Sequence, residues 1–311
     1  MRVEDKKGKL DRLVEDWLGS MTCLDASKGT YVRVLKSWNR WMILNKHYNA
    51  MGATRNDVND YRSWMISSGK SSHTICNYLC ILRMFYRYLY QRGEKPDIIS
   101  GIRGVKRQKY FNKRPLTNTQ VEDLFGCIDV STEIGMRDRL ILMLMVGAGL
   151  RCCEVARLDS DDIITISGTA SLRLQRKGHL SKDLYIPISD AVRDALSDYL
   201  ALRHPAKGEP MIITYNRRLR DKKRIRVADV EMVAAQRMAA AGIRGDGLSA
   251  HSLRHTFGCM LVDEGTPMNE VQMLMGHNSI DATMIYVKMA AERELYAKNP
   301  ANRIKIPRKA S

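Results

Sequence analysis

The sequence lacks the marks of secreted, membrane-spanning and zinc-binding proteins. Its seven cysteines are an odd number without a CxxC pair, and the adjacent Cys152 and Cys153 are poorly placed to form a disulfide. The longest uncharged apolar run, residues 140–150, is too short to cross a bilayer, and the N-terminus carries charges instead of the apolar stretch of a signal peptide. We therefore expect buried, reduced cysteines in a cytoplasmic protein, with no bound metal and no membrane partner.

Acidic residues are scarce relative to basic ones. The 311 residues include 51 Lys and Arg against 34 Asp and Glu, which gives a net charge of +17. Such an excess indicates a polyanionic partner, and nucleic acid fits better than an acidic membrane surface, because no basic amphipathic helix is evident. The phosphate-binding pattern GxxxxGK[ST] is also absent. The composition thus predicts a nucleic-acid-binding protein, and the chain has no P-loop motif.

Residues 1–102 have the pattern of a helical domain. An apolar stripe with the 3.6-residue period of a helix opens it, formed by Leu10, Leu13, Val14, Trp17 and Leu18. Three further segments begin near Ser, Thr or Asn, so we expect about four helices and no strand. Aromatic residues at helical spacing are expected in the core of this domain: Trp38, Trp41, Tyr48, Tyr61, Trp64, Tyr86, Tyr88 and Tyr90.

A strongly cationic linker, residues 103–114, follows with six basic residues and no acid. It is either a solvated tether or a strap that lies along phosphates. We favour the strap, because neutralised phosphates supply most of the affinity for nucleic acids. A second basic run, residues 217–226, has seven basic residues in ten. The residues expected to contact phosphates are Lys106, Arg107, Lys109, Arg217, Arg218, Lys222 and Lys223.

Residues 115–311 combine helical patterns with a short β region. Thr117 begins a capping box, and a buried helix is expected at 137–148. Residues 169–189 contain two alternating stretches around a turn at Lys177-Gly178, with Pro187 marking an edge. A mainly α fold with a small β-sheet is therefore expected. Three clustered acids make a metal site conceivable, but we interpret them as a solvated turn: Asp159, Asp161 and Asp162.

Four separated segments of this second domain contain residues suited to phosphate chemistry. They read GAGLRCCEVARL, LQRKGHLSKDLYIP, LSAHSLRHTFG and LMGHNSIDATMIYVK. Tyr286, in the last segment, has Met284 and Ile285 as neighbours and would, if taken alone, be interpreted as a core residue. Considered together, the segments supply two arginines, a lysine, two histidines and a tyrosine: Arg151, Lys177, His251, Arg254, His277 and Tyr286.

These motifs, in this order and spacing, resemble those of the tyrosine recombinases of the phage-integrase and Xer type. That family has an Arg box of the form GLRxxEL, a β-turn lysine, an HxLRH box and a GHxxxxxTxxY segment. The resemblance covers nearly the whole chain, including the helical domain and the basic linker. Lys288, where Xer-like members often have His, and the two cysteines of the Arg box leave the subfamily open. The matching residues are Gly149 to Arg151, Glu154, Lys177, His251 to His255, Gly276, His277, Thr283 and Tyr286.

The resemblance implies phosphoryl transfer to a protein hydroxyl, with Tyr286 as the nucleophile. Arg151 and Arg254 would clamp the non-bridging phosphate oxygens, and His277 would add a further donor. His251 would be the general base, and Lys177, on its hairpin turn, would be the general acid. His255 is expected to pack and hydrogen-bond behind the active site. The covalent intermediate preserves the phosphodiester energy, so neither ATP nor a metal ion is implied.

The resemblance also implies an architecture and a biological reaction. A helical core-binding domain (1–102), the linker (103–114) and a catalytic domain (115–311) would form a C-shaped clamp on double-stranded DNA. The reaction would be site-specific recombination through a 3′-phosphotyrosyl intermediate and a Holliday junction, by a homotetramer on two DNA sites. Accessory proteins and a nucleoid-associated location in the cytoplasm would fit that role. Alternatives are a type IB topoisomerase-like enzyme that nicks and closes DNA, and a catalytically idle DNA-binding protein.

The C-terminal residues 289–311 are expected to form an exchange tail. Residues 289–298 have the pattern of a short helix that Asn299-Pro300 ends. So short a helix is marginal alone and needs a surface on which to dock. The resemblance implies docking on a neighbouring subunit, with Leu295 as the anchor; the alternative is docking on its own subunit.

Overall fold

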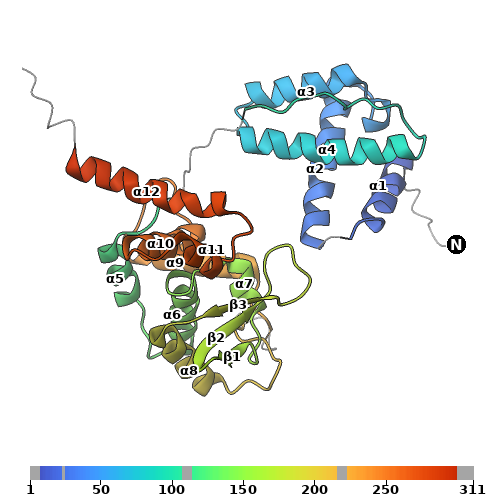
Figure 1. Ribbon diagram of the computed structural model, residues 1–311. Coiled ribbons are helices and arrows are strands. Elements are labelled where there is room, and N and C mark those ends of the chain that lie inside the picture. The colour runs from blue at the N-terminus through green and yellow to red at the C-terminus, as the bar shows by residue number, and fades with distance from the viewer. Residues whose placement is uncertain (1–7, 23–24, 107–113, 216–222, 300–311) are drawn as a thin grey trace, which may run out of the picture. The chain divides into compact units, whose positions relative to one another are not determined.

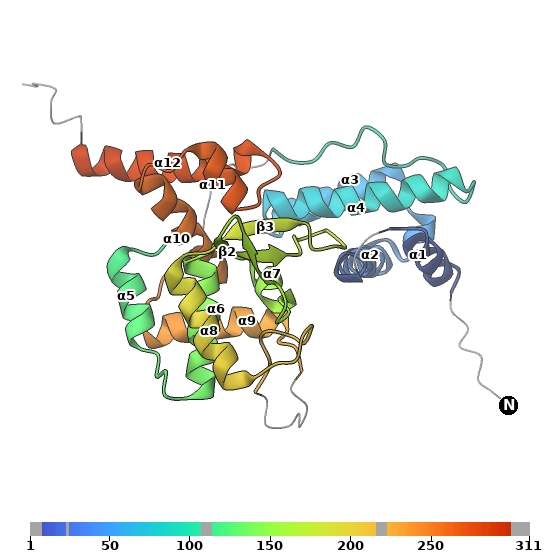
Figure 2. The same ribbon diagram turned by 60° about the horizontal axis from the view of Figure 1, so that its bottom comes forward.

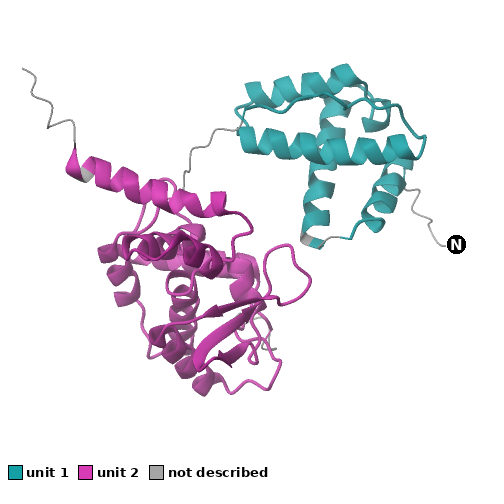
Figure 3. Ribbon diagram, in the orientation of Figure 1, with its two compact units in different colours: residues 1–110 teal, residues 111–311 magenta. Residues whose placement is uncertain are grey.

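The computed structural model of the chain describes residues 8–22, 25–106, 114–215 and 223–299. The chain divides into two compact units, residues 1–110 and 111–311 (Figure 3). The point of division lies within the expected linker, in a segment outside the described residues. The predicted domain bounds of 102 and 115 therefore stay predictions.

The first unit is built from helices, and short polar side chains cap the starts of two of its α-helices. Its elements are α1 (Lys9–Gly19), α2 (Asp25–Lys46), the short 3₁₀ helix η1 (Ala50–Gly52), α3 (Arg55–Ser67) and α4 (Ser72–Gln91) (Figure 1). Thr54 and Asp57 form a capping box at α3, and the Ser71 hydroxyl accepts a hydrogen bond from Thr74 N–H at α4. The four α-helices among the described residues of this unit agree with the helical pattern of the sequence.

An aromatic cluster fills the core of the first unit. The rings of Trp38 and Trp41 stack at 5.6 Å between centroids, and Trp38 Nε1 donates to the Tyr86 hydroxyl at 2.8 Å. That hydroxyl in turn donates to the main-chain oxygen of Ala50, so both polar atoms are satisfied in spite of their burial. The expectation that all the aromatic residues lie in the core is wrong for three that are exposed: Tyr48, Trp64 and Tyr90.

The second unit is mainly helical and contains a small sheet. Three antiparallel strands of its described residues lie in the order β1-β2-β3, and Leu172 in the middle strand pairs with Ile163 and Ile186. The strand β1 was not predicted, because its residues do not alternate between buried and exposed. Pro187 ends the edge strand β3, as its missing N–H favours. The elements, drawn in Figures 1 and 2, are α5 (Asn118–Gly126), α6 (Glu133–Val146), α7 (Cys152–Arg157), β1 (Ile163–Ile166), β2 (Thr169–Leu174), β3 (Leu184–Pro187), α8 (Asp190–Arg203), α9 (Val227–Ala240), α10 (Ala250–Asp263), α11 (Met268–Leu274) and α12 (Ile280–Lys298).

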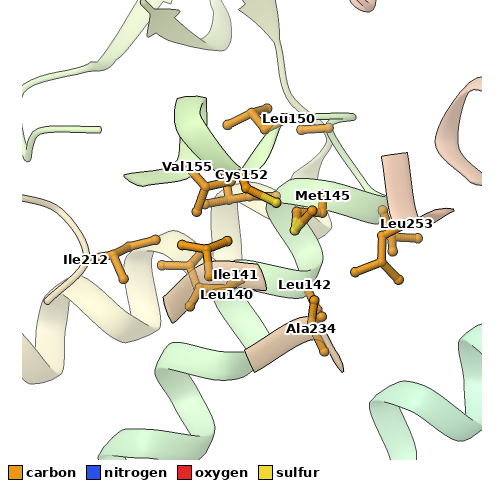
Figure 4. Packing of buried hydrophobic residues seen from close by; sticks show 14 of the residues in the cluster. Leu140, Ile141, Leu142, Met145, Leu150, Cys152, Val155, Ile212, Ala234 and Leu253 are labelled. Atoms are coloured by element: carbon orange, nitrogen blue, oxygen red, sulfur yellow. The ribbon is translucent and has the colours of Figure 1, made fainter. Parts of the chain in front are cut away.

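Helix α6 forms the centre of this core, packed against α7, α8, α9 and α10. Leu140, Ile141 and Leu142 on successive positions are all fully buried, because helices pack against α6 on more than one side (Figure 4). The same cluster contains Leu150 and Cys152, on either side of the Arg-box arginine. Arg151 is therefore held at the margin of the core by its two immediate neighbours.

The acidic cluster after α7 is not the solvated turn that was expected. Asp162 is completely buried, and its carboxylate accepts hydrogen bonds from Arg173 Nε at 3.0 Å and from Lys182 Nζ. Asp159 pairs with Lys182 and with Arg224. These partners are 11 to 65 residues away in sequence, so a local interpretation of the acids could not find them. No group of residues suited to hold a metal ion occurs in the described part of the chain.

Two further expectations need correction. Of the cysteines that the structure describes, only Cys152 and Cys259 are buried; Cys80 and Cys127 are exposed, so the free thiols do not all lie in the core. The tail does not begin with a separate short helix, because α12 runs without a break from Ile280 to Lys298. The alanines at 290 and 291 are strong helix formers and continue the helix beyond Tyr286. None of the described helices is long and apolar enough to span a membrane.

Candidate active site

A buried carboxylate lies between the two motif arginines. Arg151 is the N-cap of α7; its Nη1 donates to Glu154 Oε1 at 2.7 Å and its main-chain N–H donates to Oε2 at 2.8 Å. Arg254, from α10, places Nη1 3.5 Å from the same Oε2. Glu154 is buried, so this ion pair is little screened by solvent. The carboxylate orients both guanidiniums, and the three side chains together carry one excess positive charge.

Arg254 ties three segments together from inside the protein. It is only 4% exposed, and its guanidinium donates to the main-chain oxygens of Gly149 and Met275. Burial, followed by repulsion from Arg151, lowers the pKa of Arg254 to about 10. The group is still a cation at neutral pH. A buried charge of this kind persists only when it is paired and hydrogen-bonded, as it is here.

His277 follows a tight turn at Gly276 and is fixed by a buried threonine. Its Nδ1 lies 3.0 Å from Thr283 Oγ1, one turn into α12. Burial, then Arg254 and Arg151, lower the pKa of His277 to about 4, so the imidazole is neutral at neutral pH. A neutral imidazole has one donor and one acceptor nitrogen. When the Thr283 hydroxyl donates to Nδ1, Nε2–H is the donor that remains for an anion.

Tyr286 is enclosed by its own subunit. Only 1% of it is exposed, and its ring lies parallel to that of His277, with centroids 6.0 Å apart. A Cβ on Gly258 of α10 would stand 2.6 Å from Tyr286 Cζ, so only glycine permits this approach. Burial raises the pKa of Tyr286 to about 12, against the lowering effect of Arg254. The hydroxyl is therefore protonated here and closed to solvent, which the motif spacing alone did not reveal.

Lys177 lines an open cavity together with Arg151 and His277. It is exposed, in the loop of residues 175–183 that joins β2 to β3. The cavity has a volume of about 280 Å³. Three of the sequence-predicted residues line it: Arg151, Lys177 and His277. Sequence reasoning missed four further polar side chains of its wall: Arg176, His179, Asn278 and Ser279.

The two histidines of the HxLRH box differ in position. His251, in the first turn of α10, is exposed, and its ring centroid lies 5.9 Å from that of His255. His255 is buried and its centroid lies 5.6 Å from that of Tyr286. The sequence interpretation left His255 out of the catalytic set, although it is a direct neighbour of Tyr286. Its position four residues after His251, on the same helical face, was the signal available.

Most of the predicted phosphate-contacting residues fall outside the described part of the chain. Lys106 and Lys223 are described and exposed. The next two cations of the second basic run, Arg224 and Arg226, form ion pairs with Asp159 and Asp229. These two arginines therefore already have acidic partners within the protein. The predicted residues outside the described ranges are Arg107, Lys109, Arg217, Arg218 and Lys222.

Comparisons with known proteins agree on one family. Residues 114–293, well over half of the chain, match the Phage integrase family. The chain is 28% identical over 306 residues to tyrosine recombinase XerD of Xanthomonas campestris pv. campestris, covering 94% of this chain and 90% of the relative. It is 31% identical over 227 residues to tyrosine recombinase XerC of Azotobacter vinelandii, covering 71% of each.

A solved structure shares the fold. A lambda integrase tetramer bound to a Holliday junction superposes with a TM-score of 0.67 at 16% identity, over 91% of this chain and 78% of that one. At this identity the likeness concerns the fold, whereas the family match and the curated relatives concern the type of enzyme. The chain therefore belongs to the phage integrase family and is a tyrosine recombinase, an enzyme of site-specific recombination.

Proposed function

We propose that this recombinase cuts and rejoins double-stranded DNA through a covalent bond to Tyr286. The observation that carries the proposal is that Arg151 and Arg254 meet at the buried Glu154, and that both arginines act electrostatically on the adjacent pair His277 and Tyr286. Two guanidiniums, a neutral imidazole donor and a hydroxyl are the groups that phosphoryl transfer to a protein needs. Lys177, which lines the cavity, supplies a proton donor.

Each residue has a defined role in the proposed step. The Tyr286 Oη–P bond forms while the bond from phosphorus to the 5′ oxygen breaks. His251 takes the tyrosine proton, and Lys177 gives a proton to the departing 5′ oxygen. Arg151, Arg254 and His277 stabilise the extra negative charge on the non-bridging oxygens, a type of contribution worth roughly 3–4 kcal/mol per donor. Attack by the 5′ hydroxyl of another strand reverses the step and releases Tyr286.

The buried position of Tyr286 implies a movement before cleavage. Its hydroxyl has a pKa of about 12 and a 1% exposed side chain, so a phosphodiester cannot meet it while α12 lies against Gly258. We propose that DNA binding brings the tyrosine towards the cavity lined by Arg151 and Lys177. The positive charge there would lower the pKa of the hydroxyl once it leaves the apolar packing.

We further propose that the two units clamp double-stranded DNA in a C shape, with the basic linker along its phosphates. Four chains would act together on two recombination sites and exchange strands through a Holliday junction. The lambda integrase structure, a tetramer on such a junction, supports this assembly. The proposal covers both a Xer-like role and integration or excision of a mobile element. Accessory proteins and a nucleoid-associated, cytoplasmic location stay predictions.

The exposed end of α12 supports a role in that assembly. Leu295 and Tyr296 are 53% and 83% exposed on their own unit, although Arg293 is anchored there by an ion pair with Asp263. We propose that Leu295 docks on the neighbouring subunit. Residues 300–311 of the predicted exchange tail lie outside the described residues. A type IB topoisomerase and an idle DNA-binding protein are not favoured, because the matched relatives are site-specific recombinases.

A nicked suicide substrate tests the proposal, because loss of the small fragment beyond the nick traps the covalent complex. Wild-type protein should give a band that resists denaturant, and Tyr286→Phe should give none while binding DNA normally. Tyr296→Phe, ten residues further along the same helix and exposed, is the matched control and should react like wild type. Equal adduct from Tyr286→Phe would overturn the assignment.

A further inference from the structure

Arg176 joins both sides of the cavity with one side chain. Its Nε and Nη2 donate to the two carboxylate oxygens of Asp183 at 3.1 and 2.8 Å, which closes the β2–β3 loop across its base. Its Nη1 donates to Asn278 Oδ1 at 3.1 Å. Asn278 directly follows His277. The loop that carries Lys177 is thereby attached to the turn that carries a second residue of the active site.

Further contacts hold the same loop in place. His179 Nδ1 lies 2.7 Å from Asp183 Oδ2, and Gln175 Nε2 donates to the main-chain oxygen of His179 at 2.8 Å. Beneath the loop, Leu184 packs directly on Gly276, where a Cβ would stand 2.5 Å from Leu184 Cδ2. The close approach of the hairpin and the 276–278 turn is therefore built by two independent contacts, one polar and one apolar.

Lys177 has no comparable support of its own. Its side chain is exposed and makes no hydrogen bond or ion pair with another residue in the described ranges of the chain. A lysine ammonium on a flexible four-carbon stem reaches a defined point only if the main chain beneath it is fixed. Arg176, its immediate neighbour, attaches that main chain through its side chain to Asp183 and Asn278. Its main-chain oxygen also accepts a hydrogen bond from Arg157 Nη1 at 3.4 Å.

We propose that Arg176, bonded to Asp183 and Asn278, is a positioning residue that holds the loop so that Lys177 can protonate the leaving oxygen. This inference rests on the proposed role of Lys177 as the general acid. The Nε, Nη1 and Nη2 of Arg176 all donate to Asp183 or Asn278, so we assign it to holding the loop and not to binding the phosphate. Its hydrogen bonds also lower the pKa of Asp183 to about 2, so the pair stays ionised and nearly neutral overall.

A substrate with a sulfur in place of the bridging 5′ oxygen tests the inference, because a thiolate leaves without a proton. Arg176→Ala should cleave ordinary DNA about 10- to 100-fold more slowly, the effect expected when a catalytic group is misplaced by about 1 Å. The same variant should cleave the sulfur substrate at nearly the wild-type rate. Arg176→Lys, which cannot bond in a fork, should behave like Arg176→Ala.

Two further variants separate positioning from general damage. Arg193→Ala removes an exposed arginine that also bonds two neighbouring acids, far from the motif residues in sequence, and should be normal on both substrates. Asn278→Ala breaks only the bond across the cavity and should show a weaker form of the Arg176→Ala defect. Thermal unfolding will show whether Arg176→Ala folds poorly. If it does, Asn278→Ala still tests the proposal.

The Lys177→Ala variant distinguishes the possible failures. If the sulfur substrate restores the cleavage rate of Lys177→Ala but not that of Arg176→Ala, the assignment of Lys177 as the general acid is supported and the positioning role of Arg176 is overturned. If sulfur restores neither, the assignment of Lys177 fails, and the inference fails with it. The proposal is supported if the sulfur substrate restores the cleavage rates of both variants. It also requires that a variant with both substitutions cleaves ordinary DNA no more slowly than Lys177→Ala alone. Multiplied defects in the double variant would show that Arg176 acts independently of Lys177.

Discussion

The active site has a buried wall, made of Glu154, Arg254 and Tyr286, and an exposed rim, which includes Lys177 and His251. The wall residues are at most 4% exposed, and the pKa values of its arginine and its tyrosine are displaced to about 10 and about 12. The rim residues face solvent on a loop and in a first helical turn. Because the wall is buried and paired, we expect its side chains to support the fold, and we expect changes at the exposed rim to affect stability little.

This division also motivates the conformational step that we propose before cleavage. The groups of the wall already have protein partners: Arg254 donates to Gly149 and Met275, and Tyr286 packs on Gly258. Their interactions are optimised in the absence of DNA. The rim is open for a phosphate to enter. With Tyr286 as the proposed nucleophile, DNA binding would have to supply the free energy that releases it from the wall.

Arg254→Ala, a change in the buried wall, should have the largest effect on stability and on cleavage. It leaves the carboxylate of Glu154 with one cation fewer and two main-chain oxygens without a donor. We expect the free energy of unfolding to fall by about 3–5 kcal/mol, as for other broken buried pairs. Cleavage should become undetectable. Urea unfolding measures the first effect, with Arg193→Ala as a control that should stay within about 0.5 kcal/mol of wild type. If Arg254→Ala is as stable as wild type, the buried wall does not support the fold as we infer.

The linker tests whether exposed cations act on DNA without supporting the fold. Replacing Lys106, Arg107 and Lys109 with Gln should weaken specific and non-specific binding alike, with no change in thermal unfolding. The dependence of log affinity on log salt should flatten by about 0.9 for every phosphate that the linker no longer neutralises. Binding titrations at several salt concentrations provide the slope. An unchanged slope would favour the solvated tether.

Leu295→Ala should affect assembly rather than folding. The side chain is 53% exposed on its own unit, so its removal should change the free energy of unfolding by less than about 0.5 kcal/mol. If Leu295 docks on a neighbouring subunit, cooperative assembly on two sites should fall roughly tenfold, which corresponds to about 1.4 kcal/mol. Single-site binding should be unchanged. Gel-shift titrations separate the two states, and Lys298→Ala at the exposed end of α12 is the control.

The pH dependence of stability gives the smallest expected effect. His277 has its pKa lowered from 6.5 to about 4, so the folded state favours the neutral ring. This contribution to stability is complete above pH 6.5 and is lost as the pH falls towards 4. Wild type should therefore lose more stability over that interval than His277→Gln, which cannot titrate. Urea midpoints measured at about pH 7, 5.5 and 4.5 make the comparison, and parallel curves would contradict it.

The sequence predicted the mainly helical fold and the family, because both depend on patterns that are local in the chain. The capping box at Thr117 and the hairpin around Lys177 are of this kind, and both are present. It did not predict what depends on contacts between distant residues. The burial of Asp162 by Arg173 and Lys182 is one example, and the enclosure of Tyr286 by Gly258 is another.

Sequence-based prediction of the candidate site is limited in the same way, by contacts between distant residues. Motif spacing indicates which residues share a site, but not which of them are exposed. It placed Glu154 in the Arg box without showing that one carboxylate faces both arginines. It gave no reason to connect Arg176 with Asn278, because 102 residues separate them. The catalytic roles of the six motif residues stay predictions until the adduct and the variants are measured.

The most direct test of the central claim is to identify the amino acid that carries the DNA. The trapped complex from the suicide substrate is digested with protease and nuclease, and the peptide that retains a nucleotide is sequenced by mass spectrometry. The account predicts that the nucleotide is attached through its 3′ phosphate to Tyr286, although this side chain is enclosed by its own subunit. Attachment to the exposed Tyr296, or to any residue other than Tyr286, would contradict it.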